Sequence, residues 1–224
     1  MKIGNASYRS ADDLPDIVPV FPLSGALLLP DGQMPLNLFE PRYLAMFDAA
    51  LAGARIIGMI QPAFDGDSGP AHHPNLCKVG CLGRITSFSE TPDGRYVITL
   101  QGICRFRVQE EMTVKTPFRQ CRVMPFEMDL HEQPDAGADV DRDSLLQAFR
   151  SYLDANSLDA DWESVTRASN ATLVNALSMM SPYGPAEKQA LLEAVSLKAR
   201  AETLVAITEI ALARDNEDFA RTLQ

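Results

Sequence analysis

The sequence lacks any long, uninterrupted hydrophobic segment. No stretch of its 224 residues approaches the roughly 18 consecutive apolar residues that a membrane-spanning helix requires. The N-terminus reads MKIGNASYRSADDLPD, which has no hydrophobic core of the kind found in signal peptides. We therefore expect a cytoplasmic protein that does not enter a membrane.

The sequence also lacks the common catalytic motifs. It contains no Gly-Lys dipeptide, so the phosphate-binding loop GxxxxGK[ST] is absent, and neither GxSxG nor HExxH occurs. With only three histidines and five lysines, the chain shows no convincing set of nucleophile and base, and a small hydrolase has no residues behind it. We expect a protein that is not an enzyme and needs no cofactor.

Cysteine is scarce and does not follow a metal-binding pattern. The four cysteines, at positions 77, 81, 104 and 121, do not form the short pairs of zinc sites, and no histidine follows at ligand spacing. The last two lie in apolar, strand-like segments, where a thiol packs as a small hydrophobic group. The adjacent His72 and His73 fall in a Gly- and Pro-containing stretch, which predicts an exposed loop and no metal site.

Charge is distributed unevenly. Up to Glu127 there are 12 basic and 13 acidic residues, whereas from Met128 onward there are 8 basic and 17 acidic residues. A near-neutral half followed by a strongly acidic half indicates two units with different surfaces. An acidic chain also lacks the basic footprint of a general nucleic-acid binder, so nucleic acid is not an expected partner.

The near-neutral half has the pattern of β-structure. Short apolar runs at 17–21, 55–60, 79–88, 103–108 and 119–125 predict strands. Thr91-Pro92-Asp93-Gly94 is a strong turn signal, and alternating residues follow it from Tyr96 to Gln101. The sequence therefore predicts a hairpin centred on residues 92–94.

Prolines interrupt the apolar segment between Phe21 and Tyr43, which reads FPLSGALLLPDGQMPLNLFEPRY. Proline is excluded from central strands but accepted at strand starts, edges and bulges, which suits a closed or semi-closed barrel. Glu40-Pro41-Arg42 predicts a helix start with proline at the first helical position, and Gly53 is the predicted stop. An ion pair between Glu40 and Arg42 at this helix start is expected ahead of a recognition role.

The acidic half changes to helical periodicity. Residues 128–143 are acidic and lack an apolar period, which predicts a linker between a barrel at 1–127 and a helical bundle at 144–224. Apolar stripes follow at 145–153 and 173–180. Pro185 and Glu187 then open what the pattern predicts as one long helix, extending to Ile210.

Two arginines, Arg105 and Arg107, are expected to point the same way from one strand. They form either a small patch that contacts an anion or a peptide, or a solvated barrel face balanced by Glu110 and Glu111.

Several of these segments together resemble the Lon N-terminal, substrate-binding domain family. The opening signature of that family is similar to residues 21–43, and VGCLGRI at 79–85 and GICRF at 102–106 resemble further parts of it. In the helical half, residues 187–193 are similar to the family's final long helix. The resemblance extends from about Ile17 to about Arg214.

The resemblance implies an α+β fold, in which a PUA-like β-barrel precedes a C-terminal helical bundle. In full-length Lon proteases this region recognises damaged or unfolded proteins and precedes an ATPase and a Ser-Lys peptidase, neither of which is recognisable here. It therefore implies a non-catalytic polypeptide-binding module, an adaptor or regulator in protein quality control. Its expected partners are unfolded or damaged polypeptides and a protease.

The alternative function is an RNA-binding module, because RNA-binding proteins also use the PUA-like fold. For the polypeptide-binding function, the expected mode combines strand addition at a proline-rich edge with apolar contact in a groove between barrel and bundle, where residues 35–39 and the helix of Tyr43 are expected to meet the bundle. The candidate binding residues are Leu36, Phe39, Glu40, Arg42, Tyr43 and Arg105.

Overall fold

The computed structural model describes residues 1–64, 74–131 and 137–222, and for residues 215–222 it describes the backbone alone. The predicted loop with His72 and His73 lies outside the described residues. The chain divides into two compact units, which we call the barrel unit (residues 1–132 and 183–192) and the helical unit (residues 133–182 and 193–224). No helix in the described ranges is both long and apolar enough to cross a membrane.

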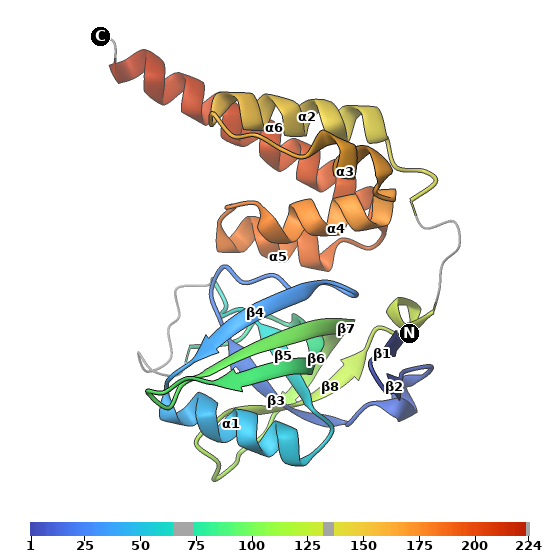
Figure 1. The fold of residues 1–224 in the computed structure, drawn as a ribbon, viewed down its shortest axis with the longest axis vertical. Coiled ribbons are helices and arrows are strands. Elements are labelled where there is room, and N and C mark those ends of the chain that lie inside the picture. The colour runs from blue at the N-terminus through green and yellow to red at the C-terminus, as the bar shows by residue number, and fades with distance from the viewer. Residues whose placement is uncertain (65–73, 132–136, 223–224) are drawn as a thin grey trace. The chain divides into compact units, whose positions relative to one another are not determined.

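The barrel unit is built on a six-stranded sheet with the strand order β4-β7-β6-β5-β3-β8 (Figure 1). Because β7 also pairs with β8, five of the strands form a closed ring, and β4 is added at the outer side of β7. Only β3 and β5 are parallel. The strands are β3 (Ile17–Pro22), β4 (Gln33–Leu38), β5 (Ile56–Ile60), β6 (Val79–Glu90), β7 (Tyr96–Glu111) and β8 (Gln120–Pro125).

The predicted hairpin at residues 92–94 is confirmed and joins β6 to β7. Thr91 and Arg95 share a backbone hydrogen bond, and Gly94 takes the left-handed conformation, with φ of 78°. The sequence predicted that the segment 103–108 was a separate strand, but it is the second half of the 16-residue β7. Glycine is required at position 102 within this strand because the carbonyl of Leu29 approaches closely: an added Cβ would lie 2.0 Å from the Leu29 oxygen.

The core of the ring is apolar and includes the predicted free thiols. Fully buried side chains include Val18, Ile103 and Phe106, and all four cysteines are reduced and buried. Burial raises the pKa of the Cys104 thiol to about 12 and that of Cys121 to about 11, so both remain protonated at neutral pH. They act as small hydrophobic groups.

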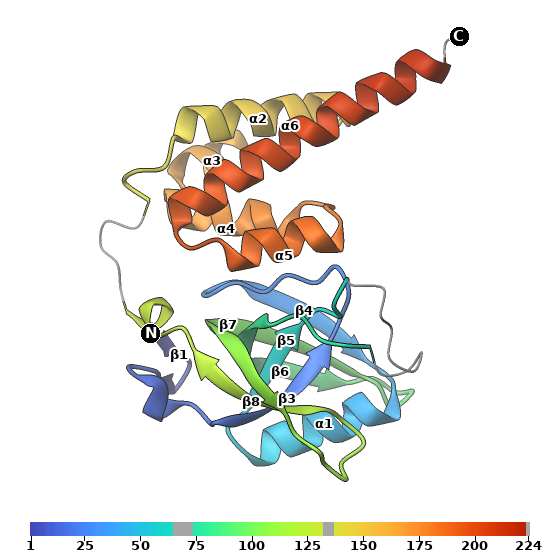
Figure 2. The ribbon, with the colours of Figure 1, turned by 180° about the vertical axis from the view of Figure 1, so that it is seen from behind.

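The remaining elements of the barrel unit cover the ring and its ends. They are β1 (Lys2–Ile3), β2 (Ala6–Ser7), η1 (Ala11–Asp13), α1 (Pro41–Ala52), η2 (Glu127–Leu130) and α5 (Pro185–Glu193). The predicted start and stop of α1 are confirmed, with Pro41 at the first helical position and Gly53 at the C-cap. Helix α1 lies at one end of the ring and α5 at the opposite end (Figure 2).

Part of the predicted linker belongs to the barrel unit. Residues Glu127–Leu130 form η2, in which Leu130 is buried in the core and Asp129 pairs with Arg105. Residues 132–136 lie outside the described ranges. The structure also groups residues 183–192 with the strands, which differs from the division at residues 143 and 144 drawn from the sequence.

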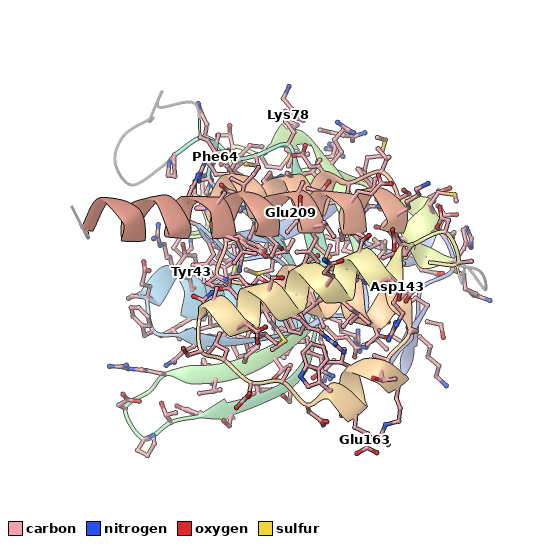
Figure 3. All side chains as sticks on the ribbon, turned by 90° about the horizontal axis from the view of Figure 1, so that it is seen from above. Tyr43, Phe64, Lys78, Asp143, Glu163 and Glu209 are labelled. Atoms are coloured by element: carbon pink, nitrogen blue, oxygen red, sulfur yellow. The ribbon has the colours of Figure 1, made fainter. Side chains whose placement is uncertain are left out.

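The helical unit contains α2 (Arg142–Ala155), α3 (Trp162–Arg167), α4 (Asn170–Met180) and α6 (Leu197–Thr222). Helix α6 packs against α2 and α4. Asp141, Asp161 and Ser169 cap α2, α3 and α4 by accepting backbone hydrogen bonds. Exposed acids lie on several helices, as Asp143, Glu163 and Glu209 show for α2, α3 and α6 (Figure 3).

The prediction of one long C-terminal helix is wrong. The chain breaks between α5 and α6, where the Ser196 side chain accepts a hydrogen bond from the Ala199 amide. Serine in this position caps a new helix and competes with continuation of the old one. Helix α5 is also held by the strands of the barrel unit, so it does not continue into α6.

Candidate groove on the barrel unit

A groove of about 830 Å³ lies on the barrel unit, at the ends of several strands. Its lining has four sources: the ends of β3 and β5, the first turn of α1, the segment before β6, and the connection from β7 to β8. The lining residues are Val20, Pro22, Arg42, Tyr43, Pro62, Pro74, Glu111, Met112, Thr113, Val114, Thr116, Pro117, Phe118 and Arg119. A volume of this size is within the range of ligand-binding clefts.

Four prolines give the groove a rigid, apolar wall. Pro22 ends β3, Pro62 follows β5 and forms an isolated bridge with Leu76, and Pro117 lies in the connection between β7 and β8. Pro22 lies beside Ile60 in the parallel pairing of β3 and β5. Because proline has no backbone N–H, these segments end the hydrogen-bonded ladders and present ring carbons to the groove.

An ion pair between a nearly buried arginine and a more exposed glutamate joins several segments of the groove. Arg119 donates from Nε and Nη2 to the two carboxylate oxygens of Glu111, each at 2.6 Å, and from Nη1 to the carbonyl of Pro74 at 2.7 Å. Its side chain is 12% exposed. The carbonyl of Arg119 also accepts from the Val20 amide at 3.0 Å. One arginine therefore connects β7, the segment before β6, and β3.

A second arginine lies at the start of α1. The guanidinium of Arg42 lies 4.6 Å from the centroid of the Tyr43 ring, and the ring of Phe21 also contacts Tyr43, with centroids 4.2 Å apart. Arg42 also donates from Nε to Glu40 at 2.9 Å and approaches it from Nη2 at 2.8 Å. The predicted ion pair at the helix start is thus confirmed, but Glu40 does not line the groove.

The hydroxyl of Tyr43 stays protonated. Burial raises the pKa of this group, and the charge of Glu40 adds to the rise, whereas Arg42 and Arg119 oppose it. This neutral hydroxyl already has a hydrogen bond with the Arg42 side chain, and it keeps its own O–H as a donor.

Leu36 and Phe39, two of the residues singled out from the sequence, do not line the groove. Leu36 is half-buried on β4, in register with Ile98. Phe39 is 60% exposed between β4 and α1, where the guanidinium of Arg95 lies 5.8 Å from its ring. The groove therefore includes Arg42 and Tyr43, with Glu40 beside them, and leaves the other two on a separate surface.

Arg105 fits neither of the two interpretations drawn from the sequence, a ligand-contacting patch or a solvated face of the barrel. It is 7% exposed, donates from Nε and Nη2 to the two oxygens of Asp129 at 2.8 Å each, and donates from Nη1 to the carbonyl of Leu192 at 3.2 Å. Burial opposes its charged form, but the hydrogen bonds and charge of Asp129 outweigh it and raise the pKa of Arg105. The side chain holds β7, η2 and α5 together, so it is not part of an exposed patch.

The predicted strand addition at a proline-rich edge would have to use β4. This strand pairs with β7 on one side, and no other described strand pairs with it. Pro35 occupies the middle of β4 and has no N–H to offer an added strand. The free edge is therefore a poor template, and the groove is the better candidate for ligand binding.

Most of the residues that line the groove were not singled out from the sequence. Glu111, Phe118 and Arg119 lie at or beyond the end of a long strand, and nothing in their local pattern shows that they approach α1. Pro117 was the only local signal, because a proline between two strands indicates a turn that can form a wall. The described lining residues include no His, Cys, Ser or Lys, and the hydroxyl of the lining residue Thr116 donates to the carbonyl of Phe118 at 2.9 Å.

The family model for the ATP-dependent protease La (LON) substrate-binding domain matches residues 17–209. The Lon protease of Flavobacterium johnsoniae is 26% identical over 197 residues, which cover 86% of this chain and 24% of that protein. Lon protease 2 of Myxococcus xanthus is 27% identical over 201 residues, covering 84% and 23%. The chain thus spans about a quarter of the length of these relatives.

Solved structures have the same fold. The crystal structure of a Lon N-terminal domain protein from Xanthomonas campestris superposes with a TM-score of 0.60 at 23% identity, over 85% of this chain and 97% of that one. The N-terminal domain of the Mycobacterium avium complex Lon protease gives 0.59 at 17% identity, over 86% and 98%. The predicted α+β class, a β ring followed by helices, is confirmed. Because the family model covers most of its length, the chain belongs to the family of Lon substrate-binding domains.

Proposed function

We propose that this protein is a polypeptide-binding module that holds extended segments of unfolded or damaged proteins in the groove of the barrel unit. Membership of a substrate-binding family supports a binding role. The observation that carries the proposal is the groove itself: about 830 Å³, walled by four prolines and floored by Tyr43 and Phe118. Such a surface suits apolar side chains of many shapes.

The expected binding energy comes mainly from apolar contact. Each square ångström of apolar surface removed from water contributes roughly 25 cal/mol, and the rigid proline wall loses little conformational freedom when a ligand binds. The two oxygens of Glu111 and all three nitrogens of Arg119 already have partners in the protein. This pair therefore shapes the groove and contributes little electrostatic attraction to a ligand. Affinity should then change little with salt.

In this role the protein acts as an adaptor or regulator in protein quality control. It binds a segment of a client and presents it to a protease, without cleaving the client and without hydrolysing ATP.

The test is the affinity for a reduced, carbamidomethylated and labelled α-lactalbumin, measured by fluorescence anisotropy at low and moderate salt. Val114 is 39% exposed at the groove, so Val114→Asp places a charge there without disturbing the core. We expect about 10-fold weaker binding by this variant. Val195→Asp is the control, since Val195 is also an exposed loop residue but lies in the helical unit.

Equal losses in Val114→Asp and Val195→Asp would contradict a specific role of the groove. Single-stranded RNA is measured in the same series. Tight RNA binding that weakens by orders of magnitude with salt, with no affinity for the unfolded protein, would overturn the proposal in favour of the RNA-binding alternative.

A further inference from the structure

The groove is asymmetric in the hydrogen-bonding groups that it leaves open. Among its charged residues, Glu111 gives both oxygens to Arg119, and Arg119 gives its three nitrogens to Glu111 and Pro74. Arg42 differs, because its guanidinium carries five N–H groups: Nε and Nη2 meet Glu40, and one further hydrogen bond joins Arg42 to the adjacent Tyr43 hydroxyl, which leaves at least one N–H of Nη1 open among the described residues. The groove therefore offers a ligand a cationic donor but no free carboxylate.

The orientation of Arg42 is fixed in advance. Its guanidinium lies 4.6 Å from the centroid of Tyr43, and Glu40 accepts from one edge of the guanidinium plane. A guanidinium that is stacked and held along one edge loses little freedom when a second acceptor binds at Nη1. The position of Arg42 in the first turn of the 12-residue helix α1 adds the positive end of the helix dipole.

Glu40 opposes this attraction only weakly. The side chains of Arg42 and Glu40 are 43% and 41% exposed, so water screens their pairing, and an exposed pair of this kind contributes about 0–1 kcal/mol. A ligand carboxylate can therefore share Arg42 with Glu40 or replace it.

We propose that Arg42 is a specificity-determining residue, which makes the groove prefer extended segments that carry an acidic side chain next to apolar ones. This inference rests on the proposed function, since it assumes that the groove binds polypeptide segments. The ligand carboxylate accepts a hydrogen bond from Nη1 of Arg42 while the neighbouring apolar side chains lie against the proline wall. A lysine or arginine at the same place finds no free acceptor among the groove-lining carboxylates and lies close to a like charge.

The test uses three labelled nonapeptides, blocked at both ends, with the same apolar residues and Glu, Gln or Lys at one central position. Blocked ends leave the side chain as the only source of a carboxylate. We expect wild-type protein to bind the Glu peptide about 5-fold more tightly than the Gln peptide, and the Lys peptide most weakly. The preference should shrink with added salt, whereas the affinity for the Gln peptide should not.

Two substitutions with opposite expected effects separate specificity from damage to the fold. Arg42→Gln should bring the affinities for the Glu and Gln peptides together, because it weakens the binding of the Glu peptide more than that of the Gln peptide. Glu40→Gln should widen the preference, because it removes the competing carboxylate. A general weakening of the site would move both peptides by the same factor.

Arg95→Gln is a matched control. Arg95 also pairs with an exposed acid two residues before it, Asp93 at 2.9 Å, and also lies over an aromatic ring, that of Phe39. It does not line the groove. This variant should keep the full preference for the Glu peptide.

The outcomes are distinguishable. If wild-type protein binds none of the three peptides, the proposed function fails with the inference. If it binds all three equally, or if Arg42→Gln leaves the preference intact, only the role of Arg42 is overturned. Single-stranded RNA that displaces the Glu peptide from wild-type protein but not from Arg42→Gln would show that the group recognised is a phosphate, which also overturns it.

Discussion

The barrel unit and the helical unit keep their shapes by different means. In the barrel unit, polar side chains that lie far apart in the sequence are buried and fully paired, as in Arg105 with Asp129 and Gln61 with Gln189. In the helical unit, the helix starts are capped by short-range contacts at the surface, such as Asp141 to Ser144 and Asp161 to Ser164. Longer-range hydrogen bonds, such as Arg142 to Asn170, go to neutral amide oxygens. A buried pair is costly to break, whereas an exposed cap is replaced by water at little cost.

The largest effect is expected from Arg105→Met. This change leaves the carboxylate of Asp129 buried without its partner, and breaking such a pair costs about 3–5 kcal/mol. Urea unfolding should show the loss in the circular dichroism of the strands. The fluorescence of Trp162, the only tryptophan and a residue of the helical unit, should shift less.

The double variant Arg105→Met with Asp129→Leu should recover part of the lost stability, because it removes both charges from the interior. If Trp162 fluorescence and the strand signal shift together in Arg105→Met, the two units unfold as one. That result would contradict a separate stabilisation of the barrel unit and the helical unit.

A smaller effect is expected from Gln189→Leu. Gln61 donates to the carbonyl of Pro185 and to the side-chain oxygen of Gln189, and Gln189 donates to the carbonyl of Val79 at 3.0 Å. Loss of the second amide leaves buried polar groups unsatisfied, at a cost of about 1–3 kcal/mol. Hydrogen exchange of the α5 amides should speed up, because this network attaches α5 to the strands.

Ala190→Gln is the control for that experiment, since Ala190 is an exposed neighbour on the same helix. If the α5 amides of Gln189→Leu still exchange slowly, apolar packing alone holds α5 in place.

The smallest effect is expected from mild acid on the helical unit. Hydrogen bonds from the Ser144 backbone and side chain lower the pKa of Asp141, and those from Ser164 lower the pKa of Asp161. A lowered pKa in the folded state means that the stabilisation is complete above the unfolded value of about 3.9 and is lost as the pH falls through the folded value. The melting temperature of the helical unit should therefore fall slightly when the pH drops from 5 to 3.

The variant Asp141→Asn with Asp161→Asn keeps two capping side chains that do not titrate. Thermal melts followed by circular dichroism should show less dependence on pH for this variant than for wild-type protein. An equal dependence in both would show that other groups control the acid sensitivity of the helical unit.

The features of the fold that the sequence predicted depend on residues that lie close together in the chain. The turn at residues 92–94 and the start of α1 at Glu40-Pro41 were predicted because proline and glycine restrict the backbone locally. The break between α5 and α6 was missed, although Ser196 is a capping residue, because the apolar pattern continues across it.

The candidate site followed the same rule. Arg42, Tyr43 and the ion pair of Arg42 with Glu40 lie within one helical turn, so a local motif was enough to single them out. Arg119 was missed because its partners, Glu111 and Pro74, come from other segments that only the closed ring brings together. Arg105 was misinterpreted because alternation along a strand gives the face of a side chain but does not show what covers that face.

The amino-acid sequence by itself determined the family, the change from strands to helices and the concentration of negative charge in the second half. These are properties of composition, period and motif, and they depend on residues close together in the chain. The tertiary structure alone decided that Arg105 is buried, that α5 joins the barrel unit, and that four distant prolines share one groove with Arg42. Each of these depends on strand pairings that close a ring over many residues, and burial is known only when every neighbour has been placed.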